Sequence, residues 1–370
     1  MSAERYNRQI ILKGFGEEAQ QKLLRAKVLV IGAGGLGCPA LQYLAAAGIG
    51  HIGIVDDDTI SLSNLHRQIL FTTADIGKLK VEVAGKRLQE MNPQIGIIRH
   101  PIRLQKNNIL DILSRYDYIL DGTDNFESRY LINDACALLN KPLIFAAVSG
   151  FEGQLAIFNT PDHSTLTPGT NYRDLFPLPP GKGEIPNCIE NGIIGVLPGI
   201  LGTMAAAETI KLVAKIGQPL TNKILNYNLL TQEQYTINIS HGDGYTLPET
   251  VDEFLNMDYQ DTSEAPQGYI EIDASELVKL QQLESTILID VRERHEVPVL
   301  DKQVYTQVPM SEFATFLNKE FYQKQVVLIC QHGIRSVAAA EALQEKYGDA
   351  KKIYSLKGGI VKWRDYFLKS

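Results

Sequence analysis

The first half of the chain alternates short apolar runs with longer segments of helical spacing. The apolar runs are rich in β-branched residues and lie at 27–31, 52–55, 118–121 and 143–147. The helical segments between them reach Ala47, span 78–91 and lie around 125–139. Because parallel strands need a crossing helix between them, this alternation predicts a mostly parallel sheet with helices on both faces.

The pattern changes after about residue 150. Residues 152–158 alternate like an antiparallel strand, and the Pro-, Gly- and Thr-rich stretch 161–186 predicts a long loop of the kind that often acts as a lid. Residues 196–216 predict a second apolar helix, and 223–239 predict a β-hairpin. The parallel sheet is therefore expected to continue into a mixed sheet.

Polar residues accumulate from His241 to Gln267, which predicts a linker. Regular spacing then resumes, with a helix at 275–283, strands at 287–290, 326–329 and 353–356, and a last helix near Trp363. The 370 residues thus predict a domain at 1–245, a linker at 246–267 and a small α/β domain at 268–370.

Composition narrows the choice of partners and compartment. The net charge is −7, with 43 acidic and 36 basic residues, which argues against nucleic acid as a bulk partner. The N-terminus lacks a signal-peptide pattern, and no apolar run is expected to span a bilayer. The 4 cysteines form no C-x-x-C pair. Together these features predict a cytoplasmic protein with free thiols and no membrane partner.

A glycine-rich motif follows the first strand. Gly32, Gly34 and Gly37 fit G-x-G-x-x-G, which permits a tight turn and a close approach of phosphate to the backbone. Asp56 ends the next strand, where an acidic residue binds ribose hydroxyls. Alone, these features favour a Rossmann-like doubly wound sheet that binds NAD, so an NAD-dependent oxidoreductase is one alternative.

Three charged residues favour a different nucleotide. Arg67 and Lys80 supply charge that the pyrophosphate of NAD would not demand. Asp124, just after a strand end, could hold Mg²⁺, which takes one or two carboxylates plus phosphate oxygens. The alternative is that Asp124 and Asn125 form only a turn and a helix cap. Taken together, the residues favour a site for Mg²⁺ and a triphosphate.

A cysteine stands at the end of a strand in the last third of the chain. Cys330 follows the apolar run 326–329 and precedes a helical segment at 337–343. Backbone N–H groups and the positive helix end therefore point at its sulfur and favour the thiolate. An inert core thiol is disfavoured because the apolar strand has ended. The short loop that follows Cys330 comprises Gln331, His332, Gly333, Ile334 and Arg335.

The first 240 residues resemble the ThiF/MoeB/HesA family, bacterial relatives of ubiquitin-activating enzymes. The motifs that carry the resemblance occur in family order at Arg5–Gln9, Gly32–Gly37, Val55–Asp58, Ser63–Gln68, Gly77–Lys80 and Asp121–Asn125. The resemblance implies ATP-dependent adenylation of the C-terminal Gly-Gly carboxylate of a ubiquitin-like sulfur-carrier protein, with release of pyrophosphate.

The resemblance also implies roles for single residues. Gly35 would contact phosphate, Asp56 the ribose, and Asp58 the metal or nucleotide. Family phosphate-binding or nucleotide-binding positions are matched by Asn64, Arg67, Gln68, Lys80 and Asn125. Asp124 matches the carboxylate linked to Mg²⁺. Arg8 matches an arginine that enters the site of the partner protomer, which implies a homodimer.

Two features depart from the family or remain open. Family members usually carry two C-x-x-C pairs that bind structural zinc. Here Asn171–Asp174 and 240–245 stand in their places without cysteine, so we expect no zinc and a hairpin held by packing alone. Cys188 matches a family cysteine that links to the carrier as a thioester or acyl-disulfide; the alternative is a buried small hydrophobe. Cys38 and Cys136 are expected in the core.

Residues 268–370 resemble a rhodanese domain. Leu288–Glu293 match its first motif, Cys330–Ser336 its active loop and Leu356–Trp363 its last motif. The resemblance implies that Cys330 accepts sulfane sulfur as a persulfide, with Arg335 and His332 adding charge. Arg335 could instead bond to carboxylates under the loop, and a phosphatase is a minor alternative.

The expectation for the whole chain is adenylation of a carrier followed by sulfur transfer from Cys330, which gives a thiocarboxylate. A donor such as a cysteine desulfurase would supply the sulfur. Molybdopterin synthesis is the first choice of pathway and thiamin the second, with tRNA thiolation and sulfur amino-acid synthesis also open. A non-catalytic carrier-binding scaffold is the remaining alternative.

Overall fold

The computed structural model describes residues 3–162, 166–179, 192–259, 269–283 and 285–367. The chain divides into two compact units, Met1–Ser263 and Glu264–Ser370, and each is described by itself. Cys188 and part of the stretch 161–186 lie outside the described residues.

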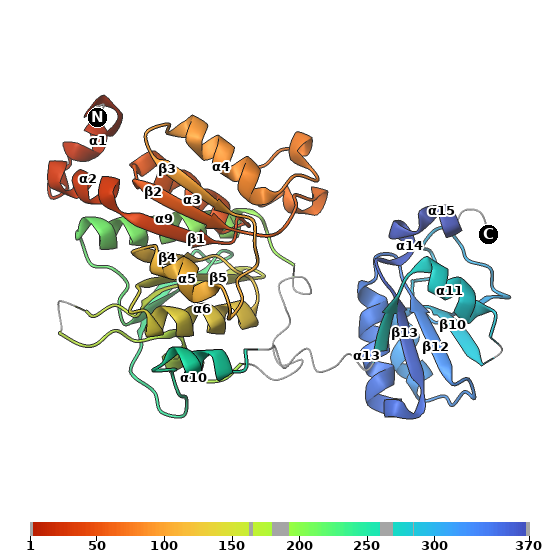
Figure 1. The fold of residues 1–370 in the computed structure, drawn as a ribbon. Coiled ribbons are helices and arrows are strands. Elements are labelled where there is room, and N and C mark those ends of the chain that lie inside the picture. Colours follow the sequence, from red (N-terminus) through yellow and green to blue (C-terminus); the bar gives the residue numbers. More distant parts are fainter. Residues whose placement is uncertain (1–2, 163–165, 180–191, 260–268, 284, 368–370) are drawn as a thin grey trace. The chain divides into compact units, whose positions relative to one another are not determined.

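The first unit is built on a sheet of eight strands in the order β3-β2-β1-β4-β5-β6-β7-β8 (Figure 1). The strands are β1 (Lys27–Ile31), β2 (His51–Val55), β3 (Gly96–His100), β4 (Tyr118–Asp121), β5 (Leu143–Ser149), β6 (Glu152–Phe158), β7 (Lys223–Asn228) and β8 (Gln234–Asn238). Neighbours from β3 to β5 are parallel, and β6, β7 and β8 add antiparallel to that edge. The prediction of a doubly wound sheet that becomes mixed is confirmed.

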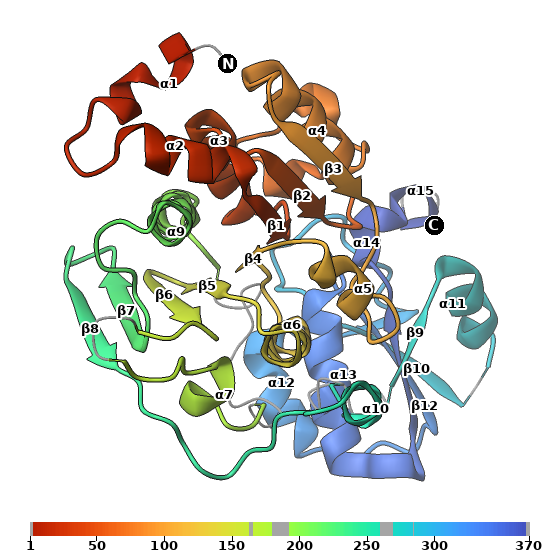
Figure 2. The ribbon, with the colours of Figure 1, turned by 60° about the vertical axis from the view of Figure 1, so that its left-hand side comes forward.

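Helices cover both faces of this sheet (Figure 2). On one face lie α2 (Gly16–Arg25), α3 (Gly37–Ala47), α4 (Lys80–Met91) and α9 (Val196–Ala214). On the other lie α5 (Ile109–Ser114), α6 (Phe126–Leu138), α7 (Tyr172–Leu175) and α10 (Val251–Asn256). The N-terminal helix α1 (Ala3–Ile10) and the short 3₁₀ helices η1 (Leu62–Asn64) and η2 (Thr73–Asp75) complete the unit.

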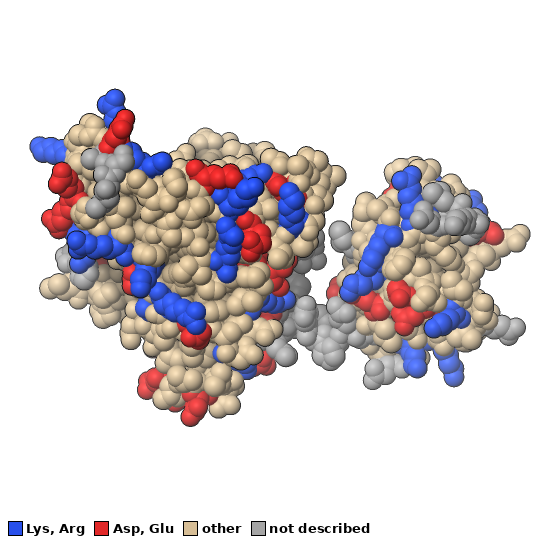
Figure 3. Space-filling view, turned by 45° about the horizontal axis from the view of Figure 1, so that its top comes forward, with Lys and Arg blue, Asp and Glu red and all other residues tan. Residues whose placement is uncertain are grey.

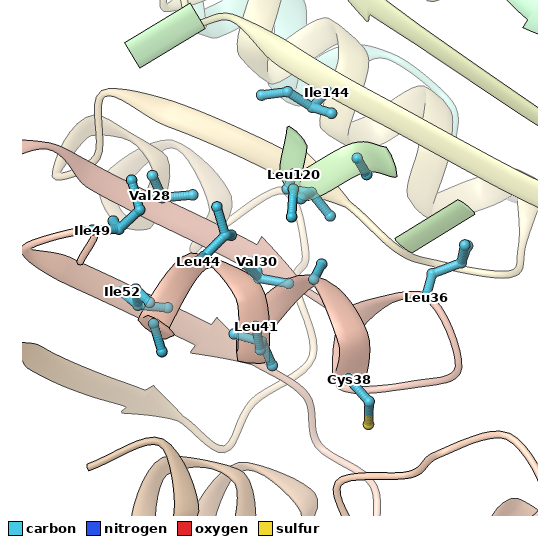
Figure 4. Packing of buried hydrophobic residues seen from close by; sticks show 14 of the residues in the cluster. Val28, Val30, Leu36, Cys38, Leu41, Leu44, Ile49, Ile52, Leu120 and Ile144 are labelled. Carbon is cyan, nitrogen blue, oxygen red and sulfur yellow. The ribbon is translucent and has the colours of Figure 1, made fainter. Parts of the chain in front are cut away.

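Strand β1 shows why the sequence folds this way. Val28 and Val30 belong to the core on one face of the sheet, and Leu29 and Ile31 belong to the core on the other. A strand buried on both faces reads as a continuous apolar run. Figure 4 shows the side chains of α3 and of the strands meeting in the first of these cores.

By length and composition alone, helix α9 could cross a membrane. The expectation that the chain has no apolar run long enough to span a bilayer is therefore corrected. Half of its most apolar window is nevertheless buried inside the first unit. Leu197, Leu201, Ala205 and Ala206 contribute to the core that α9 shares with α3. Its apolar composition is thus that of a core helix.

The predicted linker begins too early. Residues 251–256 form α10, and Phe254 is 0% exposed in the second core of the first unit. The Nζ of Lys106 donates hydrogen bonds to the carbonyls of Leu255 (3.0 Å) and Met257 (2.8 Å). The expected linker 246–267 is therefore corrected in its first part, because a few buried residues within a polar stretch suffice to hold it on the fold.

The second unit is a parallel sheet in the order β11-β10-β12-β13-β9. Its strands are β9 (Tyr269–Ile272), β10 (Thr286–Asp290), β11 (Tyr305–Gln307), β12 (Gln325–Ile329) and β13 (Lys352–Leu356). Helices α12 (Met310–Leu317) and α13 (Ile334–Tyr347) cover one face. The other face carries α11 (Ala274–Gln281), α14 (Gly359–Lys362) and α15 (Arg364–Phe367), and η4 (Gly348–Ala350) follows α13.

Candidate nucleotide and sulfur sites

The glycine motif lies where the strand order of the first sheet reverses. Strand β1 has β2 on one side and β4 on the other, so the carboxyl ends of all three meet at one crevice, the usual place for a ligand in such sheets. Gly32 has φ +90°, and a Cβ there would stand 3.0 Å from the carbonyl oxygen of Gly122. At Gly37 a Cβ would stand 1.8 Å from the carbonyl oxygen of Gly32. The turn therefore requires glycine at both positions.

Asp56 and Lys80 lie together beside this turn. The Asp56 carboxylate accepts hydrogen bonds from the N–H of Ala33 (2.8 Å) and of Asp58 (2.9 Å). The Nζ of Lys80 lies 2.7 Å from the Asp58 carboxylate and 3.8 Å from that of Asp56, and the Lys80 side chain is 6% exposed. Burial, opposed by Lys80, raises the pKa of Asp56. These two carboxylates therefore compensate the charge of the buried lysine.

The segment Ser61–Gln68 packs between the glycine loop and the start of α9. A Cβ on Gly35 would lie 3.3 Å from the Cγ of Arg67, and one on Gly195 would lie 2.0 Å from the carbonyl oxygen of His66. The side chain of Arg67 bonds to the carbonyl of Ser63 (3.1 Å) and to His66 (2.9 Å). Asn64 accepts from the N–H of Ser61 at 3.2 Å, so it also shapes this turn.

One buried polar atom in this segment fits an absent ligand. Gln68 is 3% exposed, and its Oε1 has no hydrogen-bond partner among the described residues. A Cβ at Gly34 would stand 4.0 Å from the Nε2 of the same side chain. A buried amide oxygen without a partner beside the glycine turn fits a nucleotide group that could donate a hydrogen bond to it.

Two roles were considered for the residues after β4: Asp124 as a ligand of Mg²⁺, or Asp124 and Asn125 as a turn and helix cap. The Asn125 side chain accepts from the N–H of Ser128 at 2.9 Å and caps α6. Asp124 is exposed, whereas Asp121 is 1% exposed and bonds to Thr123, and burial raises the pKa of Asp121. The buried Asp121 carboxylate thus holds the turn at Thr123, a role that the sequence did not single out.

Hard oxygen ligands for Mg²⁺ are available at this crevice. Ligand atoms of Asp56, Asp57 and Asp58 lie within 4.8 Å of one another, the one such acidic, His or Cys cluster in the part of the chain that the structure describes. Asp124 follows the end of β4, which lies on the other side of β1 from β2. These residues fit a cation that prefers a few carboxylates together with phosphate oxygens. Arg8 is exposed on α1, and within the described residues no hydrogen bond or ion pair joins it to this crevice.

The two segments that stand in place of the zinc pairs do touch. The Asp174 carboxylate accepts hydrogen bonds from the Gly242 N–H (2.8 Å) and the Tyr245 hydroxyl (2.5 Å). The amide of Asn171 donates to Tyr245 (2.7 Å), and the Nδ1 of His241 lies 3.4 Å from Asp174. We call these five residues the Asp174 cluster.

The Asp174 cluster does not fit structural zinc. Such sites use four Cys or His ligands, and here His241 is the one side chain of that kind. Both oxygens of Asp174 already accept hydrogen bonds, one from the Asn171 amide at 2.9 Å. The absence of zinc stays a prediction. The expectation that packing alone holds the hairpin is wrong, because this polar cluster ties it to α7.

In the second unit, Cys330 comes directly after β12 and four residues before α13 begins. It is 1% exposed, and the N–H of Gly333 donates to its sulfur at 3.1 Å. Gly359 has φ +62°, and a Cβ there would stand 2.5 Å from the Cys330 carbonyl oxygen. The last motif therefore clamps the loop by close backbone contact, which explains its paired glycines.

Arg335 is engaged by a carboxylate that the sequence did not reveal. Its guanidinium donates two hydrogen bonds to the carboxylate of Glu296, at 2.5 and 2.7 Å. The two residues lie 39 positions apart in the sequence. Arg335 lowers the pKa of Glu296 to about 2. His332, by contrast, is exposed. Arg292, 1% exposed, binds Asp290 and reaches the side-chain oxygen of Gln331 at 3.2 Å, so it also supports the loop.

These sites define a class of protein with a nucleotide-binding α/β unit and a separate unit that presents a cysteine on an amide-lined loop. The model of the "ThiF family" matches residues 6–244, and that of the "Rhodanese-like domain" matches residues 273–366. The chain belongs to the ThiF family and carries a C-terminal rhodanese domain.

Two curated relatives match nearly the whole chain, and a third matches a smaller part of it. "Adenylyltransferase and sulfurtransferase MOCS3" of Arabidopsis thaliana is 36% identical over 97% of this chain and 82% of its own length. "Probable adenylyltransferase/sulfurtransferase MoeZ" of Mycobacterium tuberculosis is 39% identical over 97% of this chain and 92% of its own. "Sulfur carrier protein adenylyltransferase" of Thermus thermophilus is 50% identical over 61% of this chain and 83% of its own.

Among solved structures, that of MccB from E. coli has a TM-score of 0.57 at 22% identity, and covers 68% of this chain and 75% of that one. At this identity the likeness concerns the fold, and it agrees with the sheet described above.

Proposed function

We propose that the chain is an enzyme that adenylates the C-terminal Gly-Gly of a ubiquitin-like sulfur-carrier protein and then delivers sulfur from Cys330 to it. Its relatives are named for both activities. The observation that carries the adenylation half is Lys80, a buried cation beside the glycine turn with two carboxylates as its partners. A phosphate group supplies the negative charge that such a cation accepts in their place.

The charges explain how the first step can proceed. Attack of a carboxylate on the α-phosphorus of ATP brings two anions together, and pyrophosphate leaves. Lys80 and Arg67 would offset this repulsion and stabilise the charge that develops on the phosphate oxygens. Mg²⁺, when bound by Asp124 and the nearby carboxylates, would add positive charge against the same oxygens.

The backbone and polar groups of the crevice would orient the nucleotide. Gly32, Gly34, Gly35 and Gly37 allow phosphate to approach the chain, and Asp56 lies at the strand end where ribose hydroxyls bind. Asn64, Gln68 and Asn125 fix the segments around the nucleotide. Arg8 is proposed to act in the site of a partner protomer in a homodimer, because it lies outside the crevice of its own chain.

Sulfur transfer would follow on the second unit. The terminal sulfur of a Cys330 persulfide attacks the acyl-adenylate and AMP leaves. An external dithiol then reduces the resulting acyl-disulfide, is itself oxidised to a disulfide, and releases a thiocarboxylate and the Cys330 thiol. The loop from Gln331 to Arg335 would supply amide N–H groups to the sulfur, and the Gly333 N–H, 3.1 Å from it, supports this. Cys188 is proposed as a site of acyl linkage to the carrier, and a cysteine desulfurase as the sulfur donor.

We favour molybdopterin synthesis as the pathway, in the cytoplasm, with thiamin synthesis or tRNA thiolation as alternatives. Basic and acidic side chains lie intermixed on the face seen in Figure 3, and nucleic acid is not proposed as a partner. Family membership supports neither an NAD-dependent oxidoreductase nor a non-catalytic scaffold.

Two variants test the two halves separately. Carrier-dependent ATP–pyrophosphate exchange should fall at least tenfold in Asp124→Ala; unchanged exchange would remove its assigned role. Thiosulfate:cyanide sulfurtransferase activity should be lost in Cys330→Ala while exchange persists. Full sulfur transfer by that variant would show that another group carries the sulfur. Co-purification of the ubiquitin-like carrier would decide the pathway.

A further inference from the structure

Two serine hydroxyls lead from the core of the second unit to the sulfur of Cys330. Ser355 lies on β13 and Ser336 in the first turn of α13, and both are 0% exposed. The Ser355 hydroxyl donates to the Ser336 oxygen at 2.9 Å. The Ser336 oxygen lies 3.5 Å from the Cys330 sulfur, which donates its S–H to it.

This arrangement calls for an explanation because a buried hydroxyl is costly unless it is hydrogen-bonded. Strand β13 is otherwise apolar at its buried positions, with Ile353 and Leu356 in the core. An alanine at 355 would fill the same core without any polar group. The hydroxyl of Ser355 instead bonds to Ser336, and through Ser336 it reaches the sulfur.

The direction of the bonds is set for the protonated thiol. The Ser336 oxygen accepts from both Cys330 and Ser355, and its own proton is donated to the Gly333 carbonyl at 3.0 Å. That carbonyl also accepts the N–H of Val337 at 3.4 Å. The Ser336 hydroxyl can therefore turn away from Gly333 without leaving the carbonyl unsatisfied.

We propose that the Ser355–Ser336 pair is a hydrogen-bond chain that turns toward the sulfur when Cys330 becomes an anion. The S–H bond breaks, its proton leaves to solvent base, and the Ser336 hydroxyl rotates to donate to the thiolate. Ser355 continues to donate to Ser336 and polarises it, which strengthens that bond. Together with the Gly333 N–H, the thiolate then has two donors.

Ser336 is thus a catalytic residue that touches the reacting sulfur, and Ser355 is a positioning residue that acts through it. The chain would stabilise the Cys330 sulfur both as an attacking thiolate and as the group released when its outer sulfur is transferred. The role in transfer rests on the proposed sulfur chemistry; the role in ionisation does not.

Other charged groups also face the loop. Arg335 interacts with Cys330, Glu293 and Glu296. Arg292 reaches Gln331, and the Lys362 side chain lies against Gly358. His332 is exposed on the loop itself. Because removal of either serine hydroxyl leaves all of these groups in place, a change in the pH profile of the sulfur reports on the hydroxyl.

The test is the rate of alkylation of Cys330 by iodoacetamide in the full chain from pH 5 to 9, followed by mass spectrometry of its peptide. In Ser336→Ala the profile should move up by about one pH unit, a roughly tenfold slower reaction at a given pH below the midpoint. Ser355→Ala should slow it about threefold. Ser336→Thr, which keeps the hydroxyl, should restore most of the rate.

The double variant distinguishes a chain from two separate structural effects. Ser336→Ala with Ser355→Ala should react at the rate of Ser336→Ala alone, since Ser355 acts through Ser336. Additive losses, or an unshifted profile in Ser336→Ala, would overturn the proposal. If Ser336→Ala does not fold, the proposal is tested by Ser355→Ala alone, and an unshifted profile in that variant would overturn it. Ser275→Ala, which removes an exposed hydroxyl on α11, is the matched control and should match wild type.

Alkylation needs neither ATP nor carrier, so the two proposals fail in different ways. Retained sulfur transfer in Cys330→Ala would overturn the proposed function and leave the alkylation result standing. An unshifted alkylation profile would overturn the serine chain and leave sulfur transfer by Cys330 untouched.

Discussion

The Tyr245 hydroxyl donates a 2.5 Å hydrogen bond to the Asp174 carboxylate and so joins segments 71 residues apart in the sequence. The Asp174 side chain is 0% exposed, and burial together with this carboxylate raises the pKa of Tyr245 to about 12. The phenol is therefore a neutral donor at every physiological pH. The bond fixes the chain that leaves β8 onto α7.

Tyr245→Phe should destabilise the first unit by about 1–3 kcal/mol, because it leaves a buried carboxylate without one donor. Thermal unfolding followed by a probe of the first unit measures the change. Tyr235→Phe on β8 is the control, because Tyr235 is 60% exposed and should have no effect. Equal loss in both variants would show that the Asp174 cluster adds nothing to stability.

The same relationship bears on zinc. The Asp174 cluster joins with hydrogen bonds the two segments that structural zinc would otherwise join. We therefore expect that the unfolding temperature does not change when EDTA is added. Metal analysis of the purified chain should find no stoichiometric zinc. One tightly held Zn²⁺ per chain would contradict this expectation.

The Glu296–Arg335 pair predicts a pH dependence for the second unit. Arg335 lowers the pKa of Glu296 from its ordinary value of 4.5 to about 2. A lowered pKa means that the ionised carboxylate stabilises the fold, fully above about pH 4.5, and that this stability is lost as the pH falls toward 2. Glu296→Gln should therefore cost about 1–3 kcal/mol at pH 7 and much less at pH 3.

Urea unfolding of the wild type and of Glu296→Gln across that range checks this. Glu312→Gln is a suitable control, because its pair with Arg294 is largely exposed, with side chains 54% and 65% exposed. Such pairs contribute little to stability. A difference between wild type and Glu296→Gln that does not change with pH would rule out the ion pair as its cause.

Lys80→Met should reduce ATP–pyrophosphate exchange by about 100-fold or more, since it removes the buried cation proposed to bind phosphate and keeps an unbranched side chain. Lys78→Met serves as the control two residues away: its Nζ lies 3.1 Å from Asp75, and its side chain is 57% exposed. Exchange in the control should stay within about threefold of wild type. Similar losses in both would indicate a general effect of charge rather than a bound phosphate.

Glycine substitutions separate the turn from helix propensity. Gly37→Ala should destabilise the first unit by more than about 2 kcal/mol, because its Cβ would overlap the Gly32 carbonyl, 1.8 Å away. Gly199→Ala in α9 should be neutral or stabilising by up to about 1 kcal/mol, since nothing lies within 4 Å of its Cβ. Differential scanning calorimetry of both variants measures this contrast, and a stable Gly37→Ala would refute the described turn.

The elements that could be predicted from the sequence are those whose burial in the fold leaves a regular pattern of apolar residues. Strand β1 is apolar throughout because both of its faces are buried, and it was predicted correctly. Strand β3 is half exposed along its length and has no such run, so it was missed. Helix α10 was taken for linker because its packing depends on few side chains, Phe254 foremost.

The candidate sites divide in the same way. Residues that follow strand ends, such as Asp56 and Cys330, could be found because topology brings such ends together. The pairs Glu296–Arg335 and Tyr245–Asp174 could not, because they join loops whose approach no periodicity encodes. Ser355 was missed for another reason: a single serine in a strand has no local signature.

The interiors of the two units have no residue in common. Every described member of the two core clusters of the first unit precedes residue 260, and every member of the two in the second follows residue 268. A gene rearrangement that separates the two units would therefore remove no residue from either hydrophobic core. The second unit can therefore be gained, lost or replaced as one module, and the match to the Thermus relative spans 61% of this chain and 83% of that protein.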